Sequence, residues 1–423
     1  MKKLIAILLC AVLLLMIGGC FAKTANHTLK VGFGRVDITP TVMGMPMRGS
    51  YVERYVSAAL EPIYATCIAF TDEEDNTILL FNLDLQDTLG SVFAWAKNDI
   101  EKALGIPQGQ IMMSATHMHR CQDYTAEDNQ RIVTYNKQLR EWLVEAATQA
   151  MADRKPAEMY TTSFELEGYN FVKHYIMNDG SYVGSHFGSA AGKTYVMHES
   201  EPDREFQMVK FVREGGEDLL LVNWQAHPHL DGVTKDTIYN DIVGALRKNL
   251  EERMNCKMAY FQGAAGNIDA KSRIKEEMFT TNCEEFGEVM ATQAIAAANF
   301  EKAEVGKVQI LHESFPAASK KSNAVVTKIE SYVFSIGDVA FITAPYEMFS
   351  KSGEEIKDGS PFKTTFIVGY ANGYLGYMPR QENYYYGDLE SYEARSCKYA
   401  QGTAEEHVAK YIEMLKEIYP TAK

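Results

Sequence analysis

The chain has 423 residues and carries 42 Lys and Arg against 56 Asp and Glu, which gives a formal net charge of −14 at pH 7. This acidic balance argues against nucleic acid as a partner and against electrostatic docking on an anionic membrane. Beyond Cys20 the cysteines are scattered, odd in number and without a C-x-x-C pair, which excludes a disulfide framework and a cysteine zinc site.

The first residues have the pattern of a secretory signal. Lys2 and Lys3 precede an apolar run over 4–17, and two glycines stand directly before Cys20. The run is too short to favour a transmembrane helix, and its end resembles a bacterial lipobox. We therefore expect residues 1–19 to be a lipoprotein-type signal peptide and Cys20 to be the lipidated first residue of an exported cell-envelope protein. The alternative is plain secretion; in either case the only membrane contact expected is an N-terminal lipid anchor.

After a tether over 20–28, one large α/β domain is expected over 29–420, because no linker or repeat divides it. Short apolar runs alternate with amphipathic segments, which is typical of mixed β-sheets flanked by helices. The stretch 169–199 shows no such pattern and is typical of a functional or disordered loop. The predicted strands are 29–33, 63–70, 77–83, 111–113, 158–167, 205–212, 219–224, 258–262, 308–313, 328–335, 339–343 and 364–368, and the predicted helices are 92–104, 133–151, 238–253, 284–299, 346–357 and 404–419.

A pair of histidines follows the predicted strand at 111–113. His117 and His119 are two residues apart, so a continuing strand would project both rings from one face, and a turn would spread them around one point. Strand ends are where α/β proteins place their chemistry, and two neutral imidazoles are a natural start for a zinc site. The alternative is a pair of ordinary polar loop residues, because isolated H-x-H matches are often accidental.

Four other apolar runs end in polar or glycine-rich residues in the same way. They lead to His227, to Asp269, to Glu347 and to Tyr377. Three of these have a plain structural alternative: a turn before proline for His227, a helix N-terminus that favours a carboxylate for Glu347, and core packing for Tyr377.

Taken in chain order, these stretches resemble the N-terminal catalytic domain of the neutral/alkaline ceramidase family. The resemblance covers nearly all of the chain beyond the signal peptide. No single piece is specific, but six pieces in the family's order are fairly specific together. The matching pieces are residues 34–40 (GRVDITP), 114–119 (SATHMH), 223–227 (NWQAH), 262–267 (QGAAGN), 345–349 (PYEMF) and 372–377 (NGYLGY), with a Tyr-Glu pair at 392–393.

The resemblance implies one zinc ion held by the first His of the H-x-H pair, a second His, a Glu and a Tyr. Two imidazoles, a carboxylate and a phenolate are ligands that suit Zn²⁺. It also places the second His of the pair and a later Tyr in the active site. In this chain the implied zinc ligands are His117, His227, Glu347 and Tyr377, and the two further active-site residues are His119 and Tyr392.

Three departures separate the chain from the family pattern. Asp269 stands where the family carries a nucleophilic Ser, and no Arg stands near Lys173 or His174, where the family's substrate-contacting Arg would fall. The match also ends before the family's C-terminal immunoglobulin-like domain. The resemblance therefore carries the metal site to this chain, but neither the reaction nor the substrate.

The leading hypothesis is an exported zinc-dependent hydrolase that cleaves an amide or ester bond of a small or lipid-like N-acyl substrate with a metal-activated water. His119 is expected to act as general acid or base, and Asp269 or Asp84 to orient the water or a ligand imidazole. Backbone N–H groups over 263–267 are expected to approach an oxyanion, and the alternative for this segment is a tight turn.

Two hypotheses of other classes stand beside it. The Asp in place of the nucleophilic Ser also suits a non-catalytic metal- or ligand-binding surface lipoprotein on a ceramidase-like scaffold. The aromatic residues at 384–386 and Tyr392 suit stacking on sugar rings, as in a carbohydrate- or glycolipid-handling protein, or packing in the core.

Overall fold

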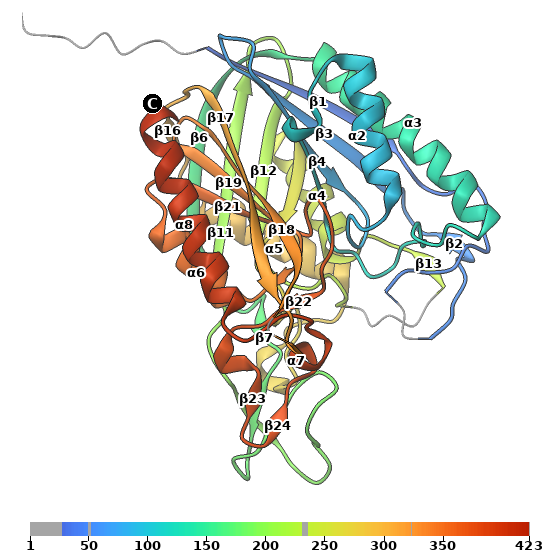
Figure 1. The fold of residues 1–423 in the computed structure, drawn as a ribbon, viewed down its shortest axis with the longest axis vertical. Coiled ribbons are helices and arrows are strands. Elements are labelled where there is room, and N and C mark those ends of the chain that lie inside the picture. Colours follow the sequence, from blue (N-terminus) through green and yellow to red (C-terminus); the bar gives the residue numbers. More distant parts are fainter. Residues whose placement is uncertain (1–27, 50–51, 231–235, 323, 423) are drawn as a thin grey trace, which may run out of the picture.

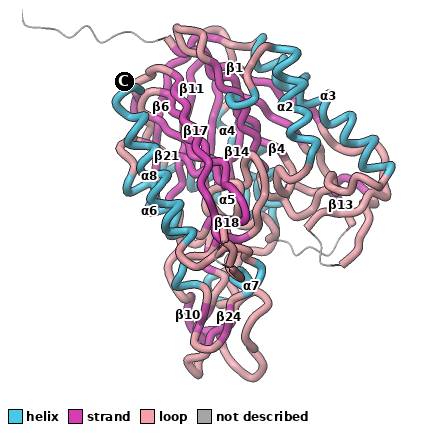
Figure 2. The backbone as a smooth tube through the Cα atoms, in the orientation of Figure 1, coloured by secondary structure: helices cyan, strands magenta, loops and turns pink. Residues whose placement is uncertain are grey.

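The computed structural model describes residues 28–49, 52–230, 236–322 and 324–422. These residues form four layers: helices, a large sheet, a small sheet, and helices again (Figure 1, Figure 2). The predicted fold class, α/β with mixed sheets flanked by helices, is confirmed. The expected signal peptide and all but the last residues of the expected tether lie outside the described residues.

The large sheet has nine strands in the order β14–β12–β11–β6–β1–β3–β4–β5, with β16 beside β6. β4 pairs with β5 and β12 with β14 in parallel, and the other neighbours are antiparallel. The strands are β1 (Leu29–Asp37), β3 (Tyr64–Thr71), β4 (Thr77–Leu83), β5 (Ile111–Ala115), β6 (Lys155–Glu165), β11 (Glu205–Arg213), β12 (Asp218–Trp224), β14 (Cys256–Gln262) and β16 (Glu301–Ala303).

The small sheet packs its inner face on the large sheet and its outer face on helices. Phe341 and Phe366 point into the layer between the sheets, and their neighbours Ile342 and Ile367 point outward. Because successive side chains of a strand point to opposite faces, such strands are apolar at every position rather than at alternate ones. The small sheet has the order β17 (Val308–Ala318), β18 (Val325–Ile336), β19 (Val339–Ala344) and β21 (Thr364–Gly369).

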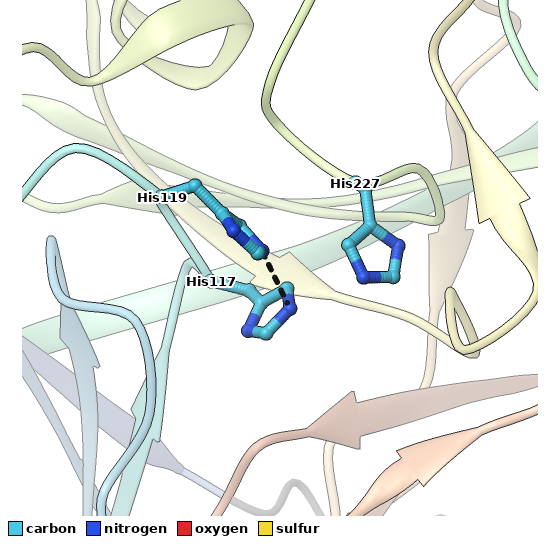
Figure 3. Close-up of side chains that lie close together, drawn as sticks. All are labelled: His117, His119 and His227. Carbon is cyan, nitrogen blue, oxygen red and sulfur yellow. Dashed lines mark hydrogen bonds between the residues drawn. The ribbon is translucent and has the colours of Figure 1, made fainter. Parts of the chain in front are cut away.

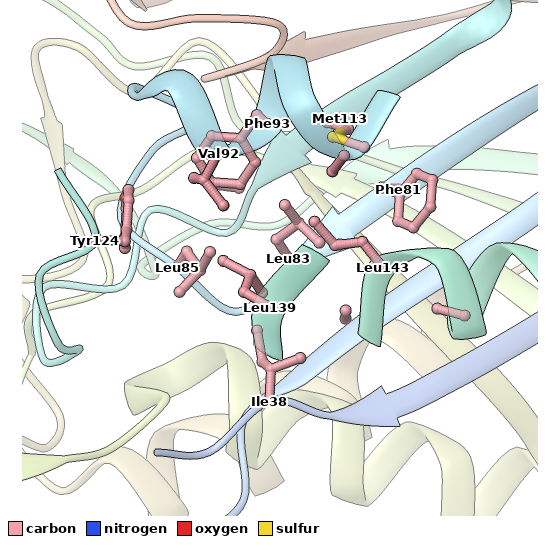
Figure 4. Packing of buried hydrophobic residues seen from close by; sticks show 14 of the residues in the cluster. Ile38, Phe81, Leu83, Leu85, Val92, Phe93, Met113, Tyr124, Leu139 and Leu143 are labelled. Atoms are coloured by element: carbon pink, nitrogen blue, oxygen red, sulfur yellow. The ribbon is translucent and has the colours of Figure 1, made fainter. Parts of the chain in front are cut away.

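Helices cover both outer faces. α2 (Ser91–Leu104) and α3 (Gln130–Ala152) cover one half of the large sheet, and α4 (Asp241–Met254) and α5 (Cys283–Ala297) cover the other half. α6 (Ser350–Gly359) and α8 (Thr403–Ala422) cover the small sheet. Figure 4 shows Leu139 and Leu143 of α3 packed with Leu83 of β4. A search of the described helices finds none with the length and apolar character to cross a membrane.

The stretch 169–199, predicted to be irregular, instead forms short strands at the lower end of the molecule in Figure 1. Two-residue and three-residue strands leave no periodic pattern, so the sequence did not reveal them. They are β7 (Phe171–Val172), β8 (Tyr175–Met177), β9 (Tyr182–Val183) and β10 (Tyr195–His198), and α7 (Tyr392–Ser396), β23 (Tyr385–Tyr386) and β24 (Leu389–Glu390) lie in the same part of the molecule.

Four predicted helix boundaries were wrong by three or more residues. α3 begins at Gln130 instead of residue 133, and α4 begins at Asp241 instead of residue 238, because Ile238 belongs to β13 (Thr237–Ile238). The helix predicted over 346–357 begins only at Ser350, because the residues before it form β20 (Glu347–Met348), which pairs with β22 (Tyr377–Met378). The last helix extends beyond residue 419 to Ala422. The remaining short elements are β2 (Ala58–Ala59), β15 (Ile268–Asp269), and 3-10 turns at Gln108–Gln110, Lys275–Glu277 and Gln381–Asn383.

Candidate metal centre

The candidate site lies at the ends of five strands, β5, β12, β14, β19 and β21. Backbone hydrogen bonds connect the segments that follow these strands. Residues far apart in the sequence are thereby fixed side by side. The bonds run from the N–H of Ala115 to the carbonyl of Tyr370, from Gly263 to Trp224, from His227 to Ile268, from Gly266 to Met348 and from Ala371 to Ala344.

Three of the predicted residues meet here. His117, His119 and His227 turn their rings toward one another, and one ligand atom from each lies within 4.8 Å of the other two (Figure 3). The Nε2 atoms of His119 and His117 are 3.1 Å apart. His117 and His227 are buried, with 0% and 2% of their surface exposed. Burial lowers the pKa of His117 to about 3, so its ring is neutral at pH 7.

Backbone carbonyls set the tautomers of two of these rings. His117 Nδ1 lies 2.7 Å from the Gln86 carbonyl oxygen, and His227 Nδ1 lies 2.9 Å from the Ile268 carbonyl oxygen. A carbonyl oxygen only accepts, so each Nδ1 carries the hydrogen, and in a neutral ring each Nε2 presents a lone pair. Both lone pairs face the same space, which is the arrangement required of two metal-binding imidazoles.

Glu347 brings a carboxylate to the same space. Its Oε2 lies 3.1 Å from His227 Nε2 and 3.8 Å from His117 Nε2. Burial alone would raise the pKa of Glu347, but a proton shared with His227 and positive charge on the His117 and His227 rings lower this pKa to about 2, so Glu347 is the ionised partner at pH 7. Its other oxygen accepts a hydrogen bond of 2.5 Å from the Tyr374 hydroxyl.

The spacing of these donor atoms fits a single tetrahedral ion. Zinc–nitrogen and zinc–oxygen bonds are about 2.0–2.2 Å long, so two donors on one zinc ion lie about 3.3 Å apart. The 3.1 Å between Glu347 and His227 and the 3.8 Å between Glu347 and His117 bracket this value. The 3.1 Å between His119 and His117 also falls near this value, and the ligand atoms of His117, His119 and His227 all lie within 4.8 Å of one another.

Tyr377 lies beside Glu347, because the two residues are direct partners in the parallel pair β20–β22. Burial and the Glu347 carboxylate raise the pKa of the Tyr377 hydroxyl well above its usual value. Lys173 contacts the same residue, with its Nζ 3.5 Å from the Tyr377 hydroxyl and 4.8 Å from the ring centroid. Tyr374 lies in the glycine-rich segment 372–377 that resembles the ceramidase family, but its residue type alone predicted no role for it.

Asp269 lies beside a histidine that the sequence reasoning missed. Its Oδ1 is 3.6 Å from His229 Nε2, and the His229 ring stacks on His119 with 5.4 Å between centroids. Burial raises the pKa of Asp269, but His229 and Lys173 outweigh it and hold this pKa below its ordinary value. The second H-x-H pattern, formed by His227 and His229, was the available signal for this residue.

Neither Asp84 nor Asp269 orients a ligand imidazole through its Nδ1, because carbonyl oxygens occupy that position on both rings. The two Asp84 oxygens instead accept hydrogen bonds of 3.0 and 2.8 Å from the Arg247 guanidinium. This part of the prediction was wrong, since backbone carbonyls carry no signature in the sequence. Asp269 contacts His229, and His229 in turn contacts the histidine cluster.

Three of the five N–H groups of segment 263–267 are engaged in a tight turn and cannot serve an oxyanion. The N–H groups of Gly263, Ala265 and Gly266 already donate to the carbonyls of Trp224, Gly263 and Met348, at 2.8, 2.9 and 2.7 Å. For these three residues the structure favours the alternative, a tight turn. A Cβ atom on Gly266 would lie 2.6 Å from the Glu347 carbonyl oxygen, so the absence of a side chain lets this turn pack against the backbone of β20.

Tyr392 packs against the site from outside the histidine cluster. Its ring lies 5.9 Å from the Tyr377 ring and 4.9 Å from the His186 ring, centroid to centroid. The next residue, Glu393, is fully buried and pairs with Lys173 Nζ at 3.3 Å and His174 Nε2 at 3.1 Å.

The neighbouring tyrosines at 384–386 mainly serve packing. Tyr384 and Tyr386 are buried, and their hydroxyls bond to the Tyr399 carbonyl and to the His174 ring. Only Tyr385 of the three is half exposed, so the segment does not offer the row of open aromatic faces that sugar stacking needs.

No family model matches the chain, and no curated protein matches it in sequence. Two solved structures are similar to it: neutral ceramidase from Pseudomonas aeruginosa, with a TM-score of 0.75 and 17% identity, and a ceramidase complexed with C2, with a TM-score of 0.74 and 15% identity. Each match covers 93% of this chain, and they cover 75% and 76% of the two ceramidase chains. The fold that the sequence resemblance implied is thus confirmed: the chain has the fold of the matched part of these ceramidases.

Proposed function

We propose that the protein is a zinc-dependent hydrolase that cleaves an amide or ester bond, with one ion held by His117, His227, Glu347 and Tyr377. The observation that carries the proposal is a group of acceptors that face one another. Glu347 Oε2 lies 3.1 Å from His227 Nε2 and 3.8 Å from His117 Nε2. The Nδ1 hydrogens of both histidines are directed at backbone carbonyls instead. Such acceptors repel one another unless a proton or a cation lies between them.

A zinc ion, when bound, polarises a carbonyl and lowers the pKa of a coordinated water to about 7. The residues of this chain supply the remaining functions. His119 Nε2 borders the same space and is placed to take a proton from the attacking water and return it to the leaving group. Asp269 holds His229 against His119, and Lys173 brings a buried positive charge to the Tyr377 hydroxyl.

The substrate class that we propose is an N-acyl amide or a related ester, either small or lipid-like. The two structural neighbours are ceramidases, and ceramide is an N-acyl lipid. Asp269 in place of a nucleophilic Ser supports attack by water rather than by a side-chain hydroxyl, because this position offers no hydroxyl group. The charged side chains around the cluster favour a polar group at the scissile bond.

We also propose that the protein is exported and anchored in the cell envelope through a lipid on Cys20. This part rests on the sequence of residues 1–20 alone.

Metal content and turnover test the proposed function together. The purified protein is expected to contain one zinc ion per chain by elemental analysis and to hydrolyse members of a panel of N-acyl amides and esters. Turnover should be lost on chelation and restored by zinc. His117→Ala should lose the zinc without unfolding, whereas His312→Ala, at an exposed position of β17, should keep it. A His117→Ala variant with full zinc content would remove His117 from the ligand set.

A non-catalytic metal-binding lipoprotein is the second candidate, and Asp269 in place of the nucleophilic Ser is the observation that favours it. The same experiment separates the two. Stoichiometric zinc with no turnover of any amide or ester in the panel would support the binding protein and reject the hydrolase.

A further inference from the structure

His117 depends on one backbone carbonyl for its orientation. The Gln86 carbonyl oxygen lies 2.7 Å from His117 Nδ1 and fixes the tautomer whose Nε2 faces the site. Gln86 lies in the irregular segment between β4 and α2, where no ladder of hydrogen bonds orients its peptide group. Another part of the structure must therefore hold this carbonyl in place.

The next residue, Asp87, is held from several sides. Its Oδ2 accepts hydrogen bonds from Arg48 Nε at 3.1 Å and Arg48 Nη2 at 2.7 Å. Its Oδ1 accepts from the Leu89 N–H at 2.9 Å and from the Tyr124 hydroxyl at 3.1 Å. The same hydroxyl lies 2.8 Å from the Asp87 carbonyl oxygen and accepts from its N–H at 3.0 Å. Both the side chain and the peptide groups of Asp87 are therefore fixed.

We propose that Asp87 is a positioning residue of the metal centre. Held by Arg48 and Tyr124, it fixes the Gln86 carbonyl and thereby keeps His117 in the tautomer and orientation that a metal ion requires. This inference rests on the proposed function for its metal, but its structural part concerns the metal-free protein.

The backbone of His117 makes such support necessary. Its φ of 65° lies in the left-handed region, which a residue with a side chain occupies only when its surroundings impose it. The Tyr370 ring stacks on the imidazole, with 3.8 Å between centroids and 17° between planes. Stacking fixes the plane of the ring, but a 180° rotation about the Cβ–Cγ bond leaves that plane unchanged and exchanges Nδ1 with Cδ2. The hydrogen bond to Gln86 fixes that rotation, and Asp87 fixes Gln86.

Asp84 provides a matched comparison. It lies three residues before Asp87, is equally buried, and forms the same kind of ion pair, with Arg247. Asp84 Oδ2 also accepts a hydrogen bond of 2.9 Å from the N–H of Tyr64. Loss of Asp84 leaves the buried Arg247 guanidinium without this carboxylate. Loss of Asp87 leaves the partly buried Arg48 with only the Asp123 carboxylate, 3.7 Å away, so both variants should lose stability. Only loss of Asp87 should change the tautomer and orientation of His117.

The experiment compares Asp87→Asn with Asp84→Asn. Zinc dissociation constants are measured by competition with a chromophoric chelator, and the tautomer of His117 is read from ¹⁵N shifts of its ring in the metal-free protein. We expect Asp87→Asn to raise the zinc dissociation constant 10–100-fold, as loss of an outer support does at other metal sites. The His117 signals should change from the pure Nδ1–H form to a mixture. Asp84→Asn should change the zinc constant by less than about threefold, although its melting temperature falls.

The proposal is overturned if the two variants weaken zinc binding equally, or if His117 keeps the pure Nδ1–H tautomer in Asp87→Asn. Should Asp87→Asn fail to fold, Tyr124→Phe removes only the hydroxyl that contacts Asp87, and it should change both readouts in the same direction by smaller amounts. A Tyr124→Phe variant with neither change would then overturn the proposal. Absence of zinc binding by the unmodified protein would reject the proposed function, whereas the tautomer comparison would still decide the role of Asp87.

Discussion

At Glu347 the structure places a negative charge against two imidazole lone pairs. Its Oε2 lies 3.1 Å from His227 Nε2, and its Oε1 accepts a hydrogen bond from Tyr374. Without a proton or a cation between them the carboxylate and the lone pairs repel, and with a metal cation the same three groups become ligands. The residue therefore has opposite effects on the metal-free and metal-bound proteins.

Glu347→Gln is expected to separate these two effects. The Gln amide can donate a hydrogen bond to His227 Nε2, so the free energy of unfolding of the metal-free protein should rise by about 1 kcal/mol. Loss of the anionic ligand should weaken zinc binding by at least about tenfold. Chemical denaturation in the presence of chelator and a zinc titration measure the two quantities. A variant that is less stable without metal and binds zinc as tightly as the unmodified protein would contradict this account of the residue.

At the scale of elements, the last helix is joined to the segment that carries Glu347 by one buried histidine. His407 of α8 contacts the Ser331 hydroxyl of β18 at 2.6 Å and the Tyr346 hydroxyl at 2.8 Å. Burial lowers the pKa of His407 to about 3, so the ring is neutral in the folded protein at pH 7. The neutral His407 ring thus connects α8 to the small sheet and to the residue before Glu347.

His407 is expected to make stability depend on pH. In the unfolded chain its pKa is near 6.5, so between pH 6.5 and about 3 only the unfolded state binds the proton. Stability from this residue is complete above pH 6.5 and falls by about 1.4 kcal/mol for each pH unit below it. The difference in unfolding free energy between the unmodified protein and His407→Gln, measured from pH 7 to pH 4, should shrink with that slope. A constant difference across this range would show that His407 does not titrate on unfolding.

The elements that end at the site were predictable because they are buried on both faces. β5, β12 and β19 lie between two apolar layers, so their sequences are largely continuous apolar runs that stop at the polar residues of the site. The sequence therefore placed His117, His227 and Glu347 directly after buried strands. It could not show that β20 pairs with β22, since a two-residue strand has no period and its partner lies 30 residues away.

The contacts that orient the site were not predictable for a different reason. Tertiary packing of loops brings three further groups into contact with the site: the Gln86 carbonyl, the Tyr374 hydroxyl and the His229 ring. Any residue type supplies a carbonyl, and tyrosine or histidine in a loop has many other uses. Sequence patterns identified the residue types that suit a metal, whereas the supports that set their tautomers and angles required the fold.

For the whole molecule, the proposed ligands come from both sheets. His117 and His227 follow strands of the large sheet, whereas Glu347 follows β19 of the small sheet and Tyr377 follows β21. An ion bound by all four would therefore link the two sheets across the end of their shared core. Its removal should loosen the packing between the sheets as well as the loops of the site.

Zinc removal is consequently expected to lower the stability of the entire domain. Free zinc at 100 times its dissociation constant should stabilise the folded protein by about 2.7 kcal/mol, because the unfolded chain cannot bring the four ligands together. For a chain of this size that corresponds to a shift of several degrees in the melting temperature at most. Calorimetry with and without chelator measures the shift. His117→Ala is the matched control, because its melting temperature should no longer respond to chelator. An equal response in this variant would show that the stabilising ion binds elsewhere, and no response in the unmodified protein would show that no ion links the two sheets.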